Sequence, residues 1–129
     1  PAELARLCGV TVGEVMSDRL GSAYRLSEKY GVTVLAKSAD TFAVSGGKVY
    51  LCTEGTTALA KGGSGDMLAG IVSSYVAQGC DALDAAALGS FTLGSTALLA
   101  GYKRSERGII ARDVIDALPR FLYDLENAD

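Results

Sequence analysis

A short run of small residues followed by an aspartate, Gly62-Gly63-Ser64-Gly65-Asp66, stands directly before the most clearly helical part of the chain. Glycine tolerates positive φ angles, which turn successive backbone N–H groups toward one point. The start of the following helix adds N–H groups without intrahelical partners and the positive end of the helix dipole. The run therefore predicts an anion-binding loop that holds a phosphate without any net positive charge on the protein.

Asp66 needs an explanation within this loop, because a carboxylate and a phosphate repel each other. The repulsion matters less if Asp66 faces an acceptor hydroxyl, whose proton it takes as a phosphoryl group arrives. The alternative is an ordinary first-turn aspartate, which helix N-termini favour on electrostatic grounds. Lys61 adds a cation beside the loop, but it precedes the glycines and no serine or threonine follows it directly, so the run is not a Walker P-loop.

The first part of the chain predicts two helices and a strand. Residues 2–8 form a short helical pattern, and a second helix begins near Ser17-Asp18 and ends at Gly31, since these residue types favour the two ends of a helix. The apolar, β-branched run 32–36 is typical of a strand covered on both faces. A helix, a glycine and such a strand make up half of a βαβ unit.

The rest of the chain predicts a hairpin and three helices. Residues 41–44 and 48–51 flank Ser45-Gly46-Gly47, which is a β-hairpin signal. The apolar residues then recur with a helical period. The three helices are expected from residue 65 to Gly79, over 82–102, and from Asp113 to about Leu125, with Pro119 expected to kink or divide the last one.

This order of elements favours an α/β architecture in which helices pack a mostly parallel sheet. We expect a small sheet of about three strands and about five helices. So few strands leave an open sheet edge, and the chain opens on Pro1 rather than on a methionine. We therefore interpret residues 1–129 as one partial domain, the C-terminal portion of a larger fold.

Composition and charge exclude several classes of function. A formal net charge of −3 gives no basic surface for nucleic acid, so no nucleic-acid partner is expected. The chain has no histidine, and its three cysteines form no C-x-x-C pair, which excludes the usual zinc sites and Ser-His or Cys-His nucleophiles. We expect no metal ligands, a reducing cytoplasmic setting for the free thiols, and no membrane partner, because no apolar run approaches the roughly 20 residues of a membrane span.

Lys37 follows the expected strand 32–36, and α/β proteins bind ligands at the carboxyl ends of their strands. It is a candidate phosphate ligand together with the turn Ser38-Ala39-Asp40-Thr41, and the alternative is a solvated lysine at a strand end. The loop Glu54–Thr57 is a further candidate for contacts with a base or a ribose, and is equally an ordinary turn.

Four segments of the chain form a specific combination: Pro1–Leu7, Lys61–Gly70, Ala77–Gly79 and Ile110–Pro119, with an alanine-rich helix between the last two. Together they resemble the ADP/ATP-dependent NAD(P)H-hydrate dehydratases of the ribokinase-like superfamily. The Gly-Gly-Ser-Gly-Asp run is shared with other ribokinase-like enzymes, so its combination with the last segment carries the specificity. The resemblance extends over essentially the whole chain and implies the C-terminal portion of a three-layer α/β/α fold.

The resemblance implies an enzyme that repairs hydrated NADH and NADPH. It would phosphorylate the ring hydroxyl of the S-epimer with ADP or ATP, accompanied by Mg²⁺, after which phosphate leaves and the nicotinamide ring is restored. By position, Asp66 falls on the catalytic aspartate that contacts the hydrate, and Gly65 on a nucleotide contact. The other positions expected to bind the nucleotide are Lys37, Ser38, Ala39, Asp40, Thr41, Gly62, Gly63 and Ser64.

The chain departs from the family pattern at three places. Lys37-Ser38 replaces the usual Lys-Gly, the loop Glu54–Thr57 lacks a frequent asparagine, and Leu93-Gly94 stands where His-Gly is common. Two other functions stay open beside the dehydratase. One is a small-molecule kinase of the hydroxyethylthiazole or sugar type, which would use the same loop and aspartate; the other is an inactive nucleotide-binding or structural fragment. An open sheet edge also leads us to expect a homo-oligomer.

Overall fold

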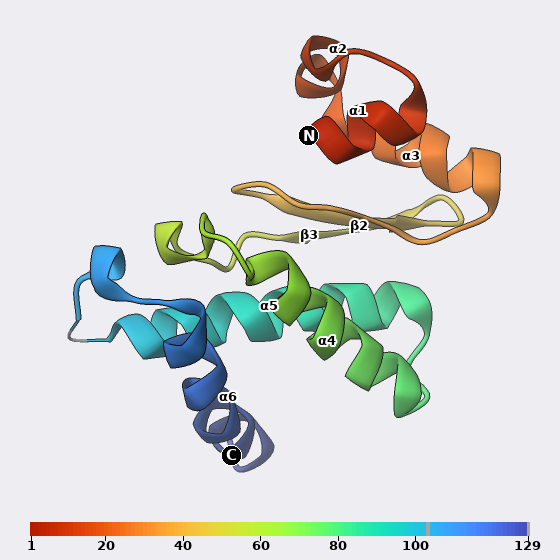
Figure 1. The fold of residues 1–129 in the computed structure, drawn as a ribbon. Coiled ribbons are helices and arrows are strands. Elements are labelled where there is room, and N and C mark those ends of the chain that lie inside the picture. The colour runs from red at the N-terminus through yellow and green to blue at the C-terminus, as the bar shows by residue number, and fades with distance from the viewer. Residues whose placement is uncertain (103, 129) are drawn as a thin grey trace. The chain divides into compact units, whose positions relative to one another are not determined.

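A computed structural model of the protein describes residues 1–102 and 104–128. The chain forms two compact units (Figure 1). The first consists of residues 1–53 and 81–87, and the second of residues 54–80 and 88–129. Each unit brings together residues that are distant in sequence, and each contains one of the two segments expected to bind the nucleotide.

The sheet of the first unit contains β1 (Val34–Ala36), β2 (Thr41–Ser45) and β3 (Lys48–Cys52), in that spatial order. Both pairs of neighbouring strands are antiparallel, so the expectation of a mostly parallel sheet is wrong for the described strands. The reason is the length of the connections. Residues 37–40 are too few for the crossover that two parallel strands require, and the next connection is only two residues long.

The hairpin prediction is confirmed. Ser45 pairs with Lys48, so the turn consists of Gly46 and Gly47, with φ angles of 51° and 77°. Two consecutive positive φ angles define the turn type whose twist matches that of the flanking strands, and glycine adopts them without steric strain.

Three helices precede the sheet: α1 (Ala2–Cys8), α2 (Val12–Ser17) and α3 (Arg19–Tyr30). The predictions of α1 and α3 are confirmed, including Gly31 in the left-handed conformation after α3. Helix α2, which is only six residues long, is not among the helices predicted from the sequence. Its signal was a capping box, in which Thr11 and Glu14 each bond the other's backbone N–H.

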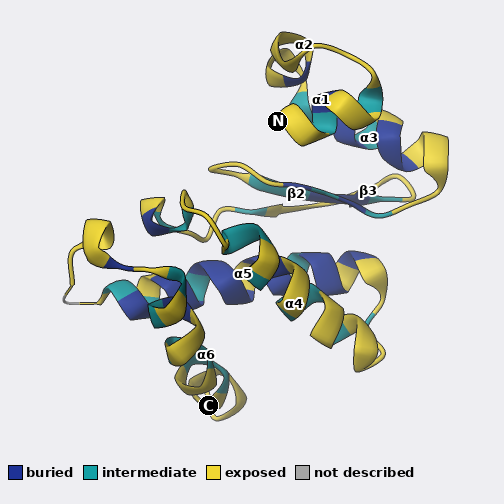
Figure 2. Cartoon of the chain, in the orientation of Figure 1, coloured by how far each residue is buried: buried dark blue, intermediate teal, exposed yellow. Residues whose placement is uncertain are grey.

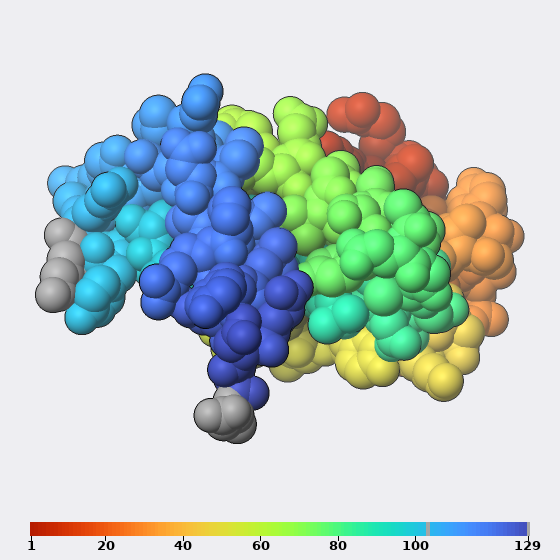
Figure 3. Space-filling model, turned by 90° about the horizontal axis from the view of Figure 1, so that it is seen from below, coloured from red at the N-terminus to blue at the C-terminus, as the bar shows by residue number. Residues whose placement is uncertain are grey.

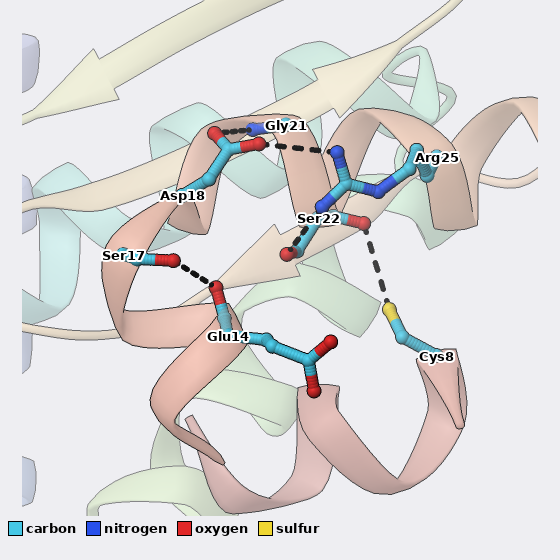
Figure 4. A network of polar contacts seen from close by, with 7 residues as sticks. All are labelled: Cys8, Glu14, Ser17, Asp18, Gly21, Ser22 and Arg25. Carbon is cyan, nitrogen blue, oxygen red and sulfur yellow. Dashed lines mark hydrogen bonds and ion pairs between the residues drawn. The ribbon is translucent and has the colours of Figure 1, made fainter. Parts of the chain in front are cut away.

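A polar network fixes the junction between these helices (Figure 4). The Asp18 carboxylate accepts the Gly21 N–H at 2.9 Å and an ion pair from Arg25 at 3.1 Å. Arg25 also donates to the Ser22 hydroxyl, and the Cys8 thiol donates to the Ser22 carbonyl. Asp18 therefore both begins α3 and links its first turn to its second.

The sheet buries different residues on its two faces, as the apolar run 32–36 predicts. Val34, Ala36 and Val44 pack on α3. Leu35 and Ala43, which lie opposite each other in the register, face the other way and pack on Leu83 and Ala86 at the start of the next long helix. Because side chains alternate along a strand, β1 must be apolar at every position to serve both layers.

The second unit is built from helices. They are α4 (Ser64–Ala77), most of α5 (Ala82–Gly101) and α6 (Ala111–Glu126), with the 3₁₀ turns η1 (Thr57–Leu59) and η2 (Glu106–Gly108). The surfaces of α4 and α6 adjoin (Figure 3). All three long helices lie where the sequence predicts them. Pro119 does not divide α6, which is continuous from Ala111 to Glu126.

α5 corrects the expectation that no apolar stretch approaches the length of a membrane span. It is 20 residues long with a mean hydropathy of 1.3, which by length and composition alone is enough to cross a membrane. Of its apolar window, 56% is buried within the structure, and Figure 2 shows buried residues along most of the helix. Such burial is what the central helix of a folded protein shows.

Two mid-helix glycines give a stability prediction. A Cβ atom on Gly94 of α5 would collide with the backbone carbonyl of Glu54, whereas one on Gly70 of α4 would meet nothing within 4 Å. We expect Gly94→Ala to lower the free energy of unfolding by about 1–3 kcal/mol, because the backbone must shift. Gly70→Ala is the matched control and should be neutral or stabilising by up to about 1 kcal/mol through helix propensity. Equal effects in urea unfolding would contradict this packing of α5.

Candidate functional site

The glycine run forms a turn that leads directly into α4. Gly63 caps the helix with a φ angle of 90° and offers no side-chain hydrogen bond. Its carbonyl accepts the Met67 N–H at 3.0 Å, while the Ser64 N–H makes only a long contact of 3.5 Å to Lys61. The N–H groups of Gly65 and Asp66 have no acceptor among the described residues. The loop therefore leaves backbone donors open for an anion at the positive end of the helix dipole.

Asp66 is the third residue of α4, and its side chain is exposed. It stands at the edge of a pocket of about 200 Å³ between α4, α5 and α6. The other residues that line this pocket are Met67, Gly70, Ile71, Leu93, Thr96, Val114, Ile115 and Leu118. The carboxylate therefore has access to solvent on a wall that is otherwise mostly apolar, and it is free to meet a hydroxyl group.

Lys61 has a different role from the one that the sequence indicated. Its ammonium donates to the backbone carbonyls of Glu106 and Arg107, each at 3.1 Å, and to that of Ile109. An ammonium has three N–H donors, and all three have carbonyl partners here. The interpretation of Lys61 as a cation offered to a phosphate therefore does not match its contacts.

A second contact joins the same two segments. The Thr57 hydroxyl donates to the Glu106 carboxylate, which also accepts from the Thr56 hydroxyl. These hydrogen bonds, the one from Thr57 first, hold the pKa of the Glu106 carboxyl below its ordinary value. The threonines of the Glu54–Thr57 loop thus bond the chain itself, and sequence reasoning missed their partner because it lies 49 residues away.

The predicted segment Lys37–Thr41 lies in the first unit, where it connects β1 to β2. Lys37 and the bend Ser38-Ala39-Asp40 are exposed, and the Thr41 hydroxyl donates to the Ser38 carbonyl at 3.4 Å. Arg19, which sequence reasoning missed, donates to the Asp40 carbonyl. Its guanidinium also stacks on the Phe42 ring, 5.1 Å from the ring centre, so the bend is held at both sides.

A groove of about 610 Å³ adjoins Lys37. Its charged walls come from Arg6, Arg19 and Lys37, with Glu3 as the one carboxylate in its lining, and its apolar walls include Leu4 and Leu26. Three cations against one carboxylate give the groove a net positive charge. It fits an anionic molecule that also has apolar surface.

The described residues contain no group of three or more histidine, cysteine, aspartate or glutamate side chains that could hold a metal ion. Mg²⁺ beside a nucleotide needs fewer, because the phosphates and water supply most of its ligands and the protein adds one or two carboxylates. A metal that arrives with a nucleotide would take its ligands chiefly from the phosphates and water, which leaves the Asp66 carboxylate available for a hydroxyl group.

Comparison with known proteins supplies the family. The profile of the NAD(P)H-hydrate dehydratases matches residues 1–120. The chain belongs to the NAD(P)H-hydrate dehydratase family. The matched residues include both predicted segments, Lys37–Thr41 and Gly62–Asp66, and the solved structures of the family show the same ribokinase-like α/β fold.

The individual relatives agree with this assignment. A bifunctional NAD(P)H-hydrate repair enzyme from Vibrio cholerae is 37% identical over 95% of the chain, and an ADP-dependent (S)-NAD(P)H-hydrate dehydratase from Neisseria meningitidis is 39% identical over 75% of it. The ADP/ATP-dependent NAD(P)H-hydrate dehydratase from Bacillus subtilis, solved after co-crystallisation with ATP/Mg²⁺ and soaking with CoA, superposes with a TM-score of 0.86 at 29% identity over 95% of the chain.

The match covers most of this chain but only part of each relative. The chain spans 25% of the V. cholerae protein, 33% of the N. meningitidis protein and 46% of the B. subtilis structure. The family and the fold are therefore established for these residues, while the activity of the longer relatives reaches this chain only by inference.

The contact between Glu106 and the two threonines predicts a pH dependence. Because the folded-state pKa of Glu106 is lowered, its contribution to stability is present above the ordinary glutamate pKa of about 4.3 and is lost as the pH falls through the folded value. Glu106→Gln removes this titration but keeps an acceptor for the hydroxyl groups. The thermal unfolding midpoint of the natural chain should exceed that of the variant at pH 7, and the difference should shrink below about pH 4.3. A difference that stays constant down to pH 3 would contradict the contact.

Proposed function

We propose that this chain provides the nucleotide-binding loop and the catalytic aspartate of an ADP- or ATP-dependent (S)-NAD(P)H-hydrate dehydratase. The observation that carries the proposal is the start of α4, where the Gly65 and Asp66 N–H groups have no acceptor in residues 1–102 and 104–128 and the Asp66 carboxylate is exposed. The family match and the names of the relatives support the substrate class.

In this proposal the loop binds the phosphates of the nucleotide through backbone donors. A net charge of −3 gives the chain no general attraction for anions. Binding must therefore come from backbone N–H groups that all point toward the phosphate. Lys37 and the turn up to Thr41, which follow the end of β1, are further candidates for contact with a nucleotide. Mg²⁺ bound to the phosphates would neutralise the charge that develops during transfer.

Asp66 acts on the other reactant. The hydroxyl of the hydrated ring attacks the terminal phosphoryl group, and the Asp66 carboxylate takes the hydroxyl proton as the new P–O bond forms and the bond to the leaving nucleotide breaks. Phosphate then leaves the ring carbon with the C–O bonding pair, and loss of a proton from the ring restores the dihydronicotinamide. The step demands little base strength from the carboxylate, because the transition state of phosphoryl transfer is loose.

We further propose that the chain self-associates and works in the cytoplasm. The outer strand β3 supports the first point, because Val49, Tyr50 and Leu51 are exposed by 41%, 46% and 57%, and β2 is its one neighbour among the described strands. All three cysteines are free, which suits a reducing compartment.

Size-exclusion chromatography with light scattering at two protein concentrations tests the proposed self-association, and a monomer at both concentrations would contradict it.

Nucleotide binding is the first test of the proposed function. Mg·ADP and Mg·ATP should raise the thermal unfolding midpoint of the chain, because a ligand that binds only the folded state stabilises it. Gly65→Val places a branched side chain in the loop and should weaken the affinity by at least about tenfold, equivalent to one lost hydrogen bond to a charged group. Unchanged affinity in Gly65→Val would contradict the assignment of the loop to phosphate.

Turnover is the second test. Incubation of the chain with hydrated NADH and Mg·ADP should restore the absorbance of reduced nicotinamide, which a simple kinase would not do. Asp66→Asn should abolish this recovery and keep most of the nucleotide affinity, because it removes the proton acceptor and leaves the backbone donors in place. Near-normal turnover in Asp66→Asn would refute the catalytic role. Binding of Mg·ADP without any turnover would identify the chain as a nucleotide-binding part that needs further residues for catalysis.

A further inference from the structure

Lys61 is a cation next to a predicted phosphate loop whose ammonium is directed to the protein's own backbone. Its three carbonyl partners belong to Glu106, Arg107 and Ile109, within one short segment that follows α5. A lysine that binds phosphate keeps its donors free for the ligand. Here a phosphate could gain the ammonium only by replacing a carbonyl, and that carbonyl would then lose its partner.

The segment that Lys61 binds borders the glycine loop. Ile109, at its end, is only 1% exposed, whereas Glu106, Arg107 and Gly108 are exposed, so Ile109 is the buried anchor of the segment. A Cβ atom placed on Gly63 would lie 3.5 Å from the Cβ of Ala111, which is ordinary van der Waals contact. Lys61 leads into the glycine loop, and its three hydrogen bonds hold residues 106–109, here called the wall, next to the start of that loop.

A second bond, independent of Lys61, joins the two segments. The Thr57 hydroxyl donates to the Glu106 carboxylate at the start of the wall. Thr57 and Lys61 are four residues apart in the chain, and their partners lie within residues 106–109. Because residues 106–109 are bonded at two separate points, both their distance from residues 57–61 and their orientation relative to them are fixed.

We propose that Lys61 is a positioning residue, which fixes the wall 106–109 against the glycine loop and so directs the Gly65 and Asp66 N–H groups, without contacting phosphate itself. The identity of the anion rests on the proposed function, but the positioning role does not. The geometry of the side chain matters more than its charge, because a compact ammonium can meet three converging carbonyls and a planar guanidinium cannot meet them in the same way.

Two substitutions separate this role from a phosphate contact. Lys61→Met removes the charge and the donors, whereas Lys61→Arg keeps the charge and changes only the geometry. Lys48→Met and Lys48→Arg are the matched controls, at an exposed lysine beside the hairpin turn. For each variant we would measure hydrogen–deuterium exchange of the free chain by mass spectrometry, and the dissociation constant of Mg·ADP by calorimetry.

Both Lys61 variants should speed exchange in peptides covering residues 62–68 and 105–112 by about tenfold, with no change in peptides from α3, which report on whether the chain still folds. Both should also weaken Mg·ADP binding by about tenfold, since directed donors are lost in each. The Lys48 variants should match the natural chain in both measurements.

If Lys61→Arg exchanges its amide hydrogens at the same rate as the natural chain, the proposal is overturned. It is also overturned if Lys61→Arg keeps the natural affinity for Mg·ADP while Lys61→Met loses it, because the charge of the side chain would then be sufficient for binding. If the natural chain binds no Mg·ADP, the proposed function fails. The exchange data still decide the positioning role in that case, because they are recorded without a ligand.

Discussion

The ammonium of Lys61 joins two segments of the second unit that lie 45 residues apart in the chain. Neither segment has regular structure of its own beyond one 3₁₀ turn, so their backbone polar groups need partners from elsewhere. A single lysine satisfies three carbonyls at once, and the Thr57–Glu106 bond adds a second anchor. The conformation of the glycine loop, and with it the direction of the free N–H groups at the start of α4, depends on these contacts.

The first unit uses the same kind of interaction at its own predicted ligand segment. Arg19 donates to the Asp40 carbonyl and stacks on Phe42, so a cation holds the bend that carries the Lys37–Thr41 residues. In both units a positive side chain binds backbone carbonyls rather than a carboxylate. The two cations thereby hold the bend 38–40 and the residues before the glycine loop in place, each within its own unit.

The sequence predicted the elements better than their arrangement. The limits of α1, α3, α4 and α5 and the Gly46–Gly47 turn follow from caps, glycines and apolar periodicity, which act over a few residues. The strand direction was wrong, because the apolar run 32–36 shows that a strand is covered on both faces and says nothing of how its neighbours run. The loop Gly62–Asp66 and its aspartate were found from sequence, whereas Arg19, Thr57 and Glu106 were missed because each acts through a partner that is distant in sequence.

The sequence by itself determined the local structure of this protein and its family. Glycines that permit positive φ angles, helix caps and the Gly-Gly-Ser-Gly-Asp run act through neighbouring residues. The family profile matches residues 1–120 of the chain. Only the tertiary structure decided what Lys61 binds. A lysine beside a glycine loop has the same local sequence whether it faces a phosphate or three carbonyls, and the choice depends on where residues 106–109 return in space.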